Sequence, residues 1–368
     1  MKILIISNSY WNLFNFRKNL IDSILDRGDN VILVAQKDKY FEKFKNLKTK
    51  NYSAKVPSRK VAIFKDLIYI IRLYKIISKE KPDILITFTI KPNIYVSLIS
   101  RIIKIKVINN ITGLGSSFLN NKLFKNFTFF LYKISISSSK IVLFQNKYDR
   151  DLFLKLNIVK IKNSDVIPGS GVNTNFFKSK NIDSLKNNVF LFSGRLLKDK
   201  GIFDYLEAAL ILLKKNKNLE FHIIGDFENN EKSSPVRKII NQYLSLNVNI
   251  KYLGFVEDPR IYYEKSSCII LPSYREGLSK SLSEAASMSK PIITYDVPGC
   301  SDIVINNFNG YLAETKNVDS LVKTINKFIE TDYETRIKMG KNSRKIIKNK
   351  FSSKIIISKY LEKINSLV

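Results

Sequence analysis

The sequence predicts an α/β protein of two domains, each built around a parallel sheet. Short runs rich in Ile, Val and Leu alternate with longer helical patterns from one end of the chain to the other. Alternation of this kind gives right-handed crossovers and therefore parallel strands. The rhythm breaks once, between Pro168 and Asn188, and a chain of 368 residues is too long for one compact core.

In the first half, each predicted strand is a short β-branched run, and each predicted helix repeats apolar residues every three to four positions. The strands are Lys2–Ser7, Asn30–Ala35, Asp83–Phe88, Lys106–Asn109, Lys140–Gln145 and Asp165–Pro168. The helices are Phe16–Arg27, Val61–Lys79, Asn93–Ile103, Lys122–Ser137 and Lys147–Leu156. We therefore assign residues 1–170 to an N-terminal domain.

The second half repeats this architecture after a Gly- and Pro-containing linker at 171–188. The strands are Val189–Ser193, Glu220–Gly225, Asn249–Leu253, Cys268–Leu271 and Pro291–Thr294, and the helices are Gly201–Lys215, Pro235–Leu246, Leu278–Ser289 and Val318–Glu330. We expect 189–350 to form the C-terminal domain and the tail helix, 351–368, to pack back on the N-terminal domain. Ligands of open α/β sheets bind at the carboxyl ends of strands, so a cleft between the two facing sheets is the expected site.

Composition excludes several classes of protein. Two cysteines, Cys268 and Cys300, cannot form a disulfide framework, and they leave a structural zinc site short of ligands even with His222, the single histidine. His222 lies in an apolar run, Leu219–Gly225, and is expected to be a strand residue. No G-x-G-x-x-G follows the first strand, which argues against a dehydrogenase. The sequence shows no secretory signal and no bilayer-spanning run.

The charge indicates an anionic partner. The chain carries 62 Lys and Arg against 32 Asp and Glu, a formal net charge of +30. We expect part of this excess to come from A/T-rich coding, which would give the abundance of Lys, Asn and Ile seen throughout the chain. A phosphorylated substrate, an anionic membrane face and nucleic acid would each suit the remainder. A basic nucleic-acid-binding protein stays an alternative, although no zinc knuckle, RRM signature or recognition-helix pair is present.

Two segments carry candidate chemistry. In Ser193–Gly201, Arg195 and Lys200 stand between a strand end and a helix start, where free N–H groups and basic side chains bind phosphates. In the second segment, Ser273–Ala285, Glu276 lies at the expected helix start and Glu284 stands eight positions later, inside the helix. Both carboxylates could reach one ligand that lies across the helix end.

The pattern Gly-Arg-x4-Lys-Gly, followed by Glu-x7-Glu about eighty residues later, resembles the family 4 glycosyltransferases of the GT-B fold. The resemblance extends over nearly the whole chain. The segments Thr87–Asn93, Asn109–Gly115, Pro168–Val172 and Asp296–Cys300 resemble one branch of that family. Its members add hexoses or N-acetylhexosamines to undecaprenyl-diphosphate-linked saccharides for surface glycans. The resemblance implies two Rossmann-like domains that face each other across a cleft.

The resemblance also implies a role for each matching residue. Arg195 and Lys200 would hold the donor diphosphate, Glu276 would contact the donor sugar, and Glu284 would bind the ribose. We take Glu276, Arg195 and Lys200 as the catalytic set. The further donor contacts are expected at Gly194, Gly225, Asp226, Val256, Gly277, Leu278, Ser279 and Lys280. No metal or other cofactor is expected, because the UDP-sugar is a co-substrate.

The N-terminal domain departs from the family pattern. The first loop, expected at Ser7–Phe16, lacks the usual Gly-Gly turn, and no histidine is present to approach the sugar. Candidate residues for acceptor binding and for a lid over the donor are Asn8, Ser9, Asn12, Asn110, Thr112 and Gly113, and Asn109 is a further polar substitute for the family histidine. Which of these replaces the histidine is left open by the sequence.

The implied reaction is transfer of a sugar from a UDP-sugar, with retention of anomeric configuration, to a lipid-diphosphate-linked saccharide. A sugar-nucleotide epimerase or a phosphorylase-like enzyme on the same fold is the alternative enzyme class. Two segments, Arg59–Lys81 and Phe118–Lys140, mix cations with aromatic and aliphatic residues, as helices in a membrane interface do. We therefore expect a cytoplasmic protein held peripherally at the inner face of the cytoplasmic membrane.

Overall fold

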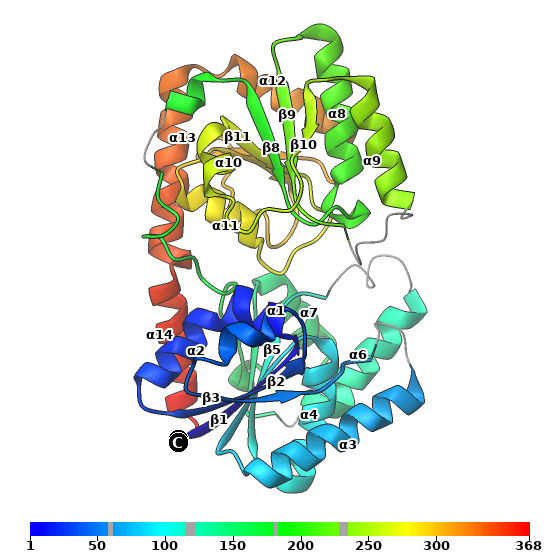
Figure 1. Ribbon diagram of the computed structural model, residues 1–368, viewed down its shortest axis with the longest axis vertical. Helices are drawn as coiled ribbons and strands as arrows, with labels where there is room; N and C mark the ends of the chain where they lie inside the picture. The colour runs from blue at the N-terminus through cyan, green and yellow to red at the C-terminus, as the bar shows by residue number, and fades with distance from the viewer. Residues whose placement is uncertain (58–61, 115–121, 138, 180–182, 228–234) are drawn as a thin grey trace. The chain divides into compact units, whose positions relative to one another are not determined.

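The computed structural model describes residues 1–57, 62–114, 122–137, 139–179, 183–227 and 235–368, with 122–124 described by their backbone alone. The chain divides into two compact units (Figure 1). Unit 1 consists of Met1–Ser170 together with Lys354–Val368, and unit 2 consists of Gly171–Ser353. The segment expected as a linker, 171–188, falls within unit 2.

The described part of unit 1 contains a parallel sheet of seven strands in the order β3-β2-β1-β4-β5-β6-β7. The strands are β1 (Lys2–Ser9), β2 (Asn30–Gln36), β3 (Thr49–Ser53), β4 (Ile84–Phe88), β5 (Lys106–Ile111), β6 (Ile141–Phe144) and β7 (Ser164–Val166). The helices are α1 (Tyr10–Asn12), η1 (Leu13–Arg17), α2 (Lys18–Asp26), η2 (Phe41–Phe44), α3 (Ile63–Glu80), α4 (Ile90–Ile103), α6 (Lys122–Ile136), α7 (Lys147–Lys155) and η3 (Ile161–Asn163).

The central strands of this sheet are covered on both faces. In β1, Ile3 and Ile5 share a core with α2 and α14 (Ser353–Asn365), whereas Leu4 and Ile6 share another core with α3 and α4. Successive side chains of a strand point to opposite faces, so an unbroken apolar run fits a strand that is covered on both sides. Substrates can therefore reach this sheet only at its edges and at its strand ends.

The last helix of the chain, α14, completes unit 1. Ile356, Tyr360 and Ile364 recur at a spacing of four residues and are buried in the core beneath α2. The Tyr360 hydroxyl donates a hydrogen bond of 2.7 Å to Oδ1 of Asn110, at the end of β5. The N-terminal sheet therefore depends on residues from the opposite end of the chain.

The described part of unit 2 contains a parallel sheet of six strands in the order β10-β9-β8-β11-β12-β13. The strands are β8 (Val189–Ser193), β9 (Glu220–Ile224), β10 (Ile250–Tyr252), β11 (Cys268–Leu271), β12 (Ile292–Tyr295) and β13 (Gly310–Ala313). The helices are η4 (Asp183–Lys186), η5 (Lys198–Lys200), α8 (Ile202–Lys215), α9 (Pro235–Leu246), α10 (Arg260–Lys265), α11 (Lys280–Ser287), α12 (Val318–Glu330), α13 (Tyr333–Ile346) and η7 (Ile347–Phe351).

The structure corrects several sequence-based expectations. The expected loop at Ser7–Phe16 is strand to Ser9 and helical from Tyr10, because the Ser9 side chain accepts a hydrogen bond from the Asn12 amide and starts a helical turn at once. Strands β3 and β13 and helix α13 were not predicted. β3 is a mostly polar strand at the sheet edge and lacks an apolar run, and α13 is a mostly polar helix.

We predict that Ile364→Ala destabilises unit 1. Ile364 is fully buried, and truncation of a buried Ile to Ala costs about 2–5 kcal/mol. Trp11 is the single tryptophan and lies in unit 1, so its fluorescence during urea unfolding reports on that unit. The transition should move to lower urea in Ile364→Ala and stay in place in Lys359→Ala, an exposed position of the same helix. Identical midpoints in both variants would contradict the docking of α14.

Candidate active site

The sequence-predicted donor residues of unit 2 gather at the carboxyl ends of its strands. β8 and β11 are neighbours in the sheet although β9 and β10 lie between them in sequence, so the connections diverge between them. Such a switch point leaves a crevice outside the strand ends. Gly194 and Arg195 follow β8 on one side, and the segment 272–279 follows β11 on the other. The two motifs therefore flank the place where an open α/β sheet binds its ligand.

Close backbone contacts hold the loops of this edge together. The Gly194 amide donates to the Ile224 carbonyl at 3.2 Å, and the Leu196 amide donates to the Asp226 carbonyl at 2.9 Å. A Cβ atom on Gly225 would lie 1.8 Å from the carbonyl oxygen of Gly194, so this contact requires glycine. These contacts fix the loop that follows β8 against the end of β9.

A largely buried ion pair joins the two sequence motifs. Nζ of Lys200 lies 2.5 Å from Oε1 of Glu276, and the two side chains are 13% and 12% exposed. The Glu276 amide donates to the Pro298 carbonyl, and a Cβ atom on Gly299 would lie 2.7 Å from Glu276, so the loop after β12 packs directly against this residue. The structure therefore brings together a cation and a carboxylate that are 76 positions apart in sequence.

Glu284 lies on α11, in the helix that follows Glu276. Ser279 begins this helix, and its side chain accepts a hydrogen bond from the Leu282 amide. Glu284 is 7% exposed, and Oε1 lies 3.3 Å from Nζ of Lys280. Burial raises the pKa of the Glu284 carboxyl above its ordinary value, while Lys280 opposes this shift. The carboxylate is thus held in a poorly hydrated position, where hydrogen bonds from a ligand would be strong.

The remaining predicted donor residues lie on loops of the same edge. Arg195 is exposed at the end of β8, and Gly277 and Leu278 are half-buried between β11 and α11. Asp226 follows β9 and Val256 follows β10, both half-buried. The structure places all of these residues after the carboxyl ends of neighbouring strands.

Hydrogen bonds among residues that the sequence analysis missed hold these loops in place. Asp204, in the first turn of α8, accepts hydrogen bonds from the hydroxyls of Tyr274 at 2.8 Å and Tyr295 at 2.6 Å. Tyr263 lies 2.9 Å from the Ser193 hydroxyl, and its pKa is raised first by burial and then by the Glu284 charge. Tyr274 stands two positions before Glu276, so this buried network restrains the loop that carries the carboxylate. The only sequence signal for this network was Asp204, an acidic residue in the first turn of a helix.

In unit 1, the predicted acceptor residues occupy two strand ends. Asn8 is exposed near the end of β1, Ser9 begins α1, and the Asn12 side chain accepts a hydrogen bond of 2.9 Å from the Ser7 hydroxyl. Thr112 and Gly113 follow β5 and are half-buried. The structure thus brings the first group to the end of β1 and the second to the end of β5.

Asn110 has a structural role. Its Nδ2 donates to the Thr87 carbonyl at 3.0 Å, and its Oδ1 accepts from Tyr360. Asn109 is fully buried and donates to the hydroxyls of Thr87 and Ser97. Thr112 and Gly113 are therefore better placed than either asparagine to meet a substrate.

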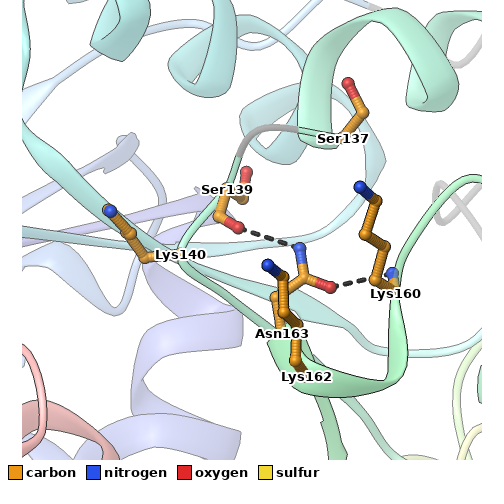
Figure 2. Close-up of a pocket in the computed structure, with 6 residues that line it drawn as sticks. All are labelled: Ser137, Ser139, Lys140, Lys160, Lys162 and Asn163. Atoms are coloured by element: carbon orange, nitrogen blue, oxygen red, sulfur yellow. Dashed lines mark hydrogen bonds between the residues drawn. The ribbon is translucent and has the colours of Figure 1, made fainter.

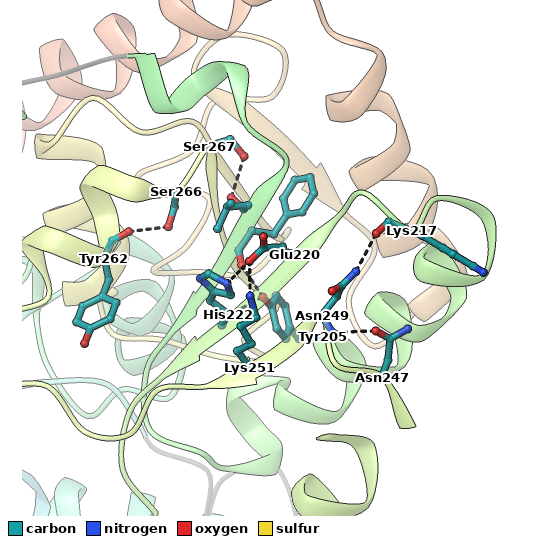
Figure 3. Close-up of polar contacts among 12 residues, drawn as sticks. Tyr205, Lys217, Glu220, His222, Asn247, Asn249, Lys251, Tyr262, Ser266 and Ser267 are labelled. Atoms are coloured by element: carbon teal, nitrogen blue, oxygen red, sulfur yellow. Dashed lines mark hydrogen bonds and ion pairs between the residues drawn. The ribbon is translucent and has the colours of Figure 1, made fainter. Parts of the chain in front are cut away.

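His222 is a strand residue, as its apolar surroundings predict. Its Nε2 lies 2.8 Å from Oε2 of Glu220, which also pairs with Lys251 at 2.8 Å on the neighbouring edge strand (Figure 3). Among the described residues, no group of three or more His, Cys, Asp and Glu side chains is placed to hold a metal ion.

A basic hollow of about 280 Å³ lies elsewhere in unit 1 (Figure 2). It is lined by Ser137, Ser139, Lys140, Lys160, Lys162 and Asn163. Lys140 precedes β6 and Asn163 precedes β7, so the hollow lies at the amino ends of the strands. None of the residues singled out for donor or acceptor binding lines it.

Comparison with known proteins gives the family. Residues 2–146 match the family model described as glycosyl transferase 4-like, and residues 173–346 match the model described as glycosyl transferases group 1. The capsular polysaccharide biosynthesis glycosyltransferase CapM of Staphylococcus aureus is 27% identical over 81% of this chain and 80% of its own length.

A full-length relative is the N,N'-diacetylbacillosaminyl-diphospho-undecaprenol alpha-1,3-N-acetylgalactosaminyltransferase of Campylobacter jejuni, which is 26% identical over 98% of both chains. Among solved structures, Anabaena Alr3699/HepE in complex with UDP-glucose matches over 100% of both chains, with a TM-score of 0.82 and 18% identity. That level of identity shows the fold alone. The two family models cover both halves of the chain, and the protein belongs to the family 4 glycosyltransferases and has the GT-B fold.

Proposed function

We propose that this glycosyltransferase moves a hexose or N-acetylhexosamine from a UDP-sugar to a lipid-diphosphate-linked saccharide. The observation that carries the proposal is the largely buried Lys200–Glu276 pair at the switch point of the unit 2 sheet. The Campylobacter relative is named for a diphospho-undecaprenol substrate, and the Anabaena structure contains UDP-glucose. Both names support a nucleotide donor and a lipid-linked acceptor.

In the proposed donor site, Lys200 and Arg195 bind the diphosphate, and Glu276 accepts hydrogen bonds from sugar hydroxyls. Lys200 already lies 2.5 Å from Glu276, so a sugar diphosphate bound there would contact both ends of the pair. Glu284, which is buried on α11, would accept hydrogen bonds from the ribose hydroxyls. Ionised hydrogen-bond partners of this kind are about twice as strong as neutral ones.

The proposed reaction retains the anomeric configuration. The bond between C1 of the sugar and the diphosphate oxygen breaks, and the acceptor oxygen bonds to C1 from the same face. The acceptor proton passes to an oxygen of the departing phosphate. The protein then has to stabilise the charge that grows on the diphosphate, and Arg195 and Lys200 are the cations proposed for this role. No metal or further cofactor is proposed for the reaction.

We also propose that the protein binds a membrane surface, and the evidence for this comes from α3. Six large apolar side chains of this helix are 41–84% exposed: Ile63, Phe64, Leu67, Ile68, Ile71 and Tyr74. They form the α3 apolar face, while Tyr69 and Leu73 on the same helix are buried in the core of unit 1. A helix that is apolar on both sides needs a second covering surface. Among the described residues, no helix is both long and apolar enough to span a bilayer.

An anionic membrane is the covering surface that we propose. Lys65, Arg72, Lys75 and Lys79 are exposed along the same helix. Each basic residue near an anionic leaflet contributes about 1 kcal/mol. The second predicted segment continues this face on α6, where Phe127, Phe130 and Ile134 are exposed, while Phe118 lies outside the described residues. α3 and α6 both pack against α4, so they lie on the same side of unit 1 (Figure 1).

The reaction is tested by incubating the full chain with a panel of UDP-sugars and an undecaprenyl-diphosphate-linked monosaccharide, with mass spectrometry of the lipid product. Lys200→Ala and Arg195→Ala should each lower kcat about a hundredfold or more, because one charge-stabilising contact in a transition state is worth that much. The matched control is Lys198→Ala, an exposed lysine of the same loop, which should keep kcat within about twofold. Near-normal turnover by either variant would refute the cationic clamp.

Membrane binding is tested by cosedimentation with phosphatidylglycerol vesicles. Binding at low salt should weaken as salt rises, because ions screen the basic side chains. The double change Phe64→Ser and Ile68→Ser should reduce binding at least fivefold, since both side chains are more than 60% exposed on α3. A control that changes Ile161 and Val248 to Ser alters equally exposed residues outside this face. Equal losses in both variants would contradict the α3 apolar face as the contact surface.

A further inference from the structure

Arg17 is a buried cation whose charge nothing in the described chain balances. It ends η1 and is 2% exposed, and its guanidinium carbon lies 3.9 Å from the centroid of the Phe88 ring. Its Nε makes no hydrogen bond to any described group, and no described carboxylate pairs with it. Burial lowers the pKa of Arg17, yet an arginine stays charged in proteins. A buried charge without a partner is costly and calls for a counter-ion.

Arg17 lies beside the carboxyl end of β4, where open α/β sheets commonly bind ligands. Phe88 ends β4, and β4 pairs with β1 although β2 and β3 lie between them in sequence. The connections of unit 1 diverge between these two strands, so their carboxyl ends flank a switch-point crevice. Arg17 ends η1, in the connection that follows β1, and its guanidinium stacks on Phe88, the last residue of β4.

The residue after Phe88 adds a second unsatisfied group. Thr89 has φ of 73°, a conformation that a β-branched residue rarely adopts, and its buried Oγ1 has no partner among the described residues. Thr89 begins α4, which has 14 residues, without a side-chain cap. The free N–H groups and the dipole at the start of such a helix favour an anion. Backbone strain of this kind is typical of ligand-binding positions.

Most neighbouring polar groups are satisfied within the protein, although the buried Oδ1 of Asn109 also has no hydrogen-bond partner among the described residues. Tyr360 donates its hydroxyl to Oδ1 of Asn110, and Nδ2 of Asn110 donates to the Thr87 carbonyl. Arg17 and Thr89 thus each keep a buried group that can donate a hydrogen bond and has no partner among the described residues. Their shared requirement is a ligand with several negatively charged acceptor oxygens.

We propose that Arg17, with Thr89 and the start of α4, binds a phosphate of the acceptor lipid's diphosphate. A guanidinium offers paired donors that match phosphate oxygens, which makes arginine suited to this ligand. The assignment to the acceptor rests on the proposed function, in which the donor diphosphate is bound by Arg195 and Lys200 of unit 2. Arg17 would then hold the charged head of the acceptor lipid.

The test uses the full chain with farnesyl diphosphate, a soluble prenyl diphosphate, and with UDP, each measured by calorimetry. Arg17→Met should weaken farnesyl diphosphate binding at least tenfold and leave the Kd for UDP within twofold. The Tm of Arg17→Met should not fall, because an apolar side chain of similar size replaces an unbalanced buried charge. Arg150→Met is the matched control, because it removes another arginine of unit 1, one that donates to Ser164.

Each other outcome overturns the inference. Unchanged farnesyl diphosphate affinity, an equal loss in Arg150→Met, or no farnesyl diphosphate binding by the unaltered chain would remove the phosphate site. A lower Tm would make Arg17 a structural residue, and a selective loss of UDP affinity would assign it to the donor. Failure of the proposed function is separate, since it would appear as no UDP binding by the unaltered chain.

Discussion

Both candidate sites depend on the common direction of the strands. Because every strand of each described sheet runs parallel to its neighbours, residues that follow different strands meet at one edge. Helices cover both faces of the central strands, so polar side chains can meet a substrate only where the strands end. In unit 2 this edge gathers Gly194, Gly225, Glu276 and Asp226, whose positions span more than eighty residues of sequence. A single backbone constraint thereby builds a site from distant motifs.

The two candidate sites differ in how their charged side chains are paired before a ligand binds. Lys200 and Glu276 neutralise each other in a poorly hydrated place, and Glu276 is fixed from the other side by the loop that contains Gly299. Breaking a buried pair by removing one partner is costly, since the other charge remains buried. Arg17 is the opposite case, a buried charge without a partner in the described chain. On our proposals, one unit carries a preformed pair for the donor and the other carries a lone cation for the acceptor phosphate.

Much of the fold could be predicted because its signal is local. Strands such as β1 and β8 are unbroken apolar runs, and α14 repeats apolar residues at helical spacing. Strand β3 was missed because an edge strand that is only half-buried needs no apolar run. The helical start at Tyr10 was missed because Ser9 can begin a helix as readily as a turn. The donor residues carried a spacing signal, whereas Asp204 and Arg17 depend on contacts between distant segments, which spacing does not reveal.

Hydrogen–deuterium exchange of the full chain with and without UDP tests the central claim most directly, since it reports where the nucleotide is bound without reference to catalysis. The account predicts slower exchange of amides in 193–201 and 272–284, the segments that follow β8 and β11. Amides in 216–219 and 247–249, at the amino ends of β9 and β10, should be unaffected. Protection confined to those amino-end loops, or to unit 1 alone, would contradict a donor site at the carboxyl ends of the unit 2 strands.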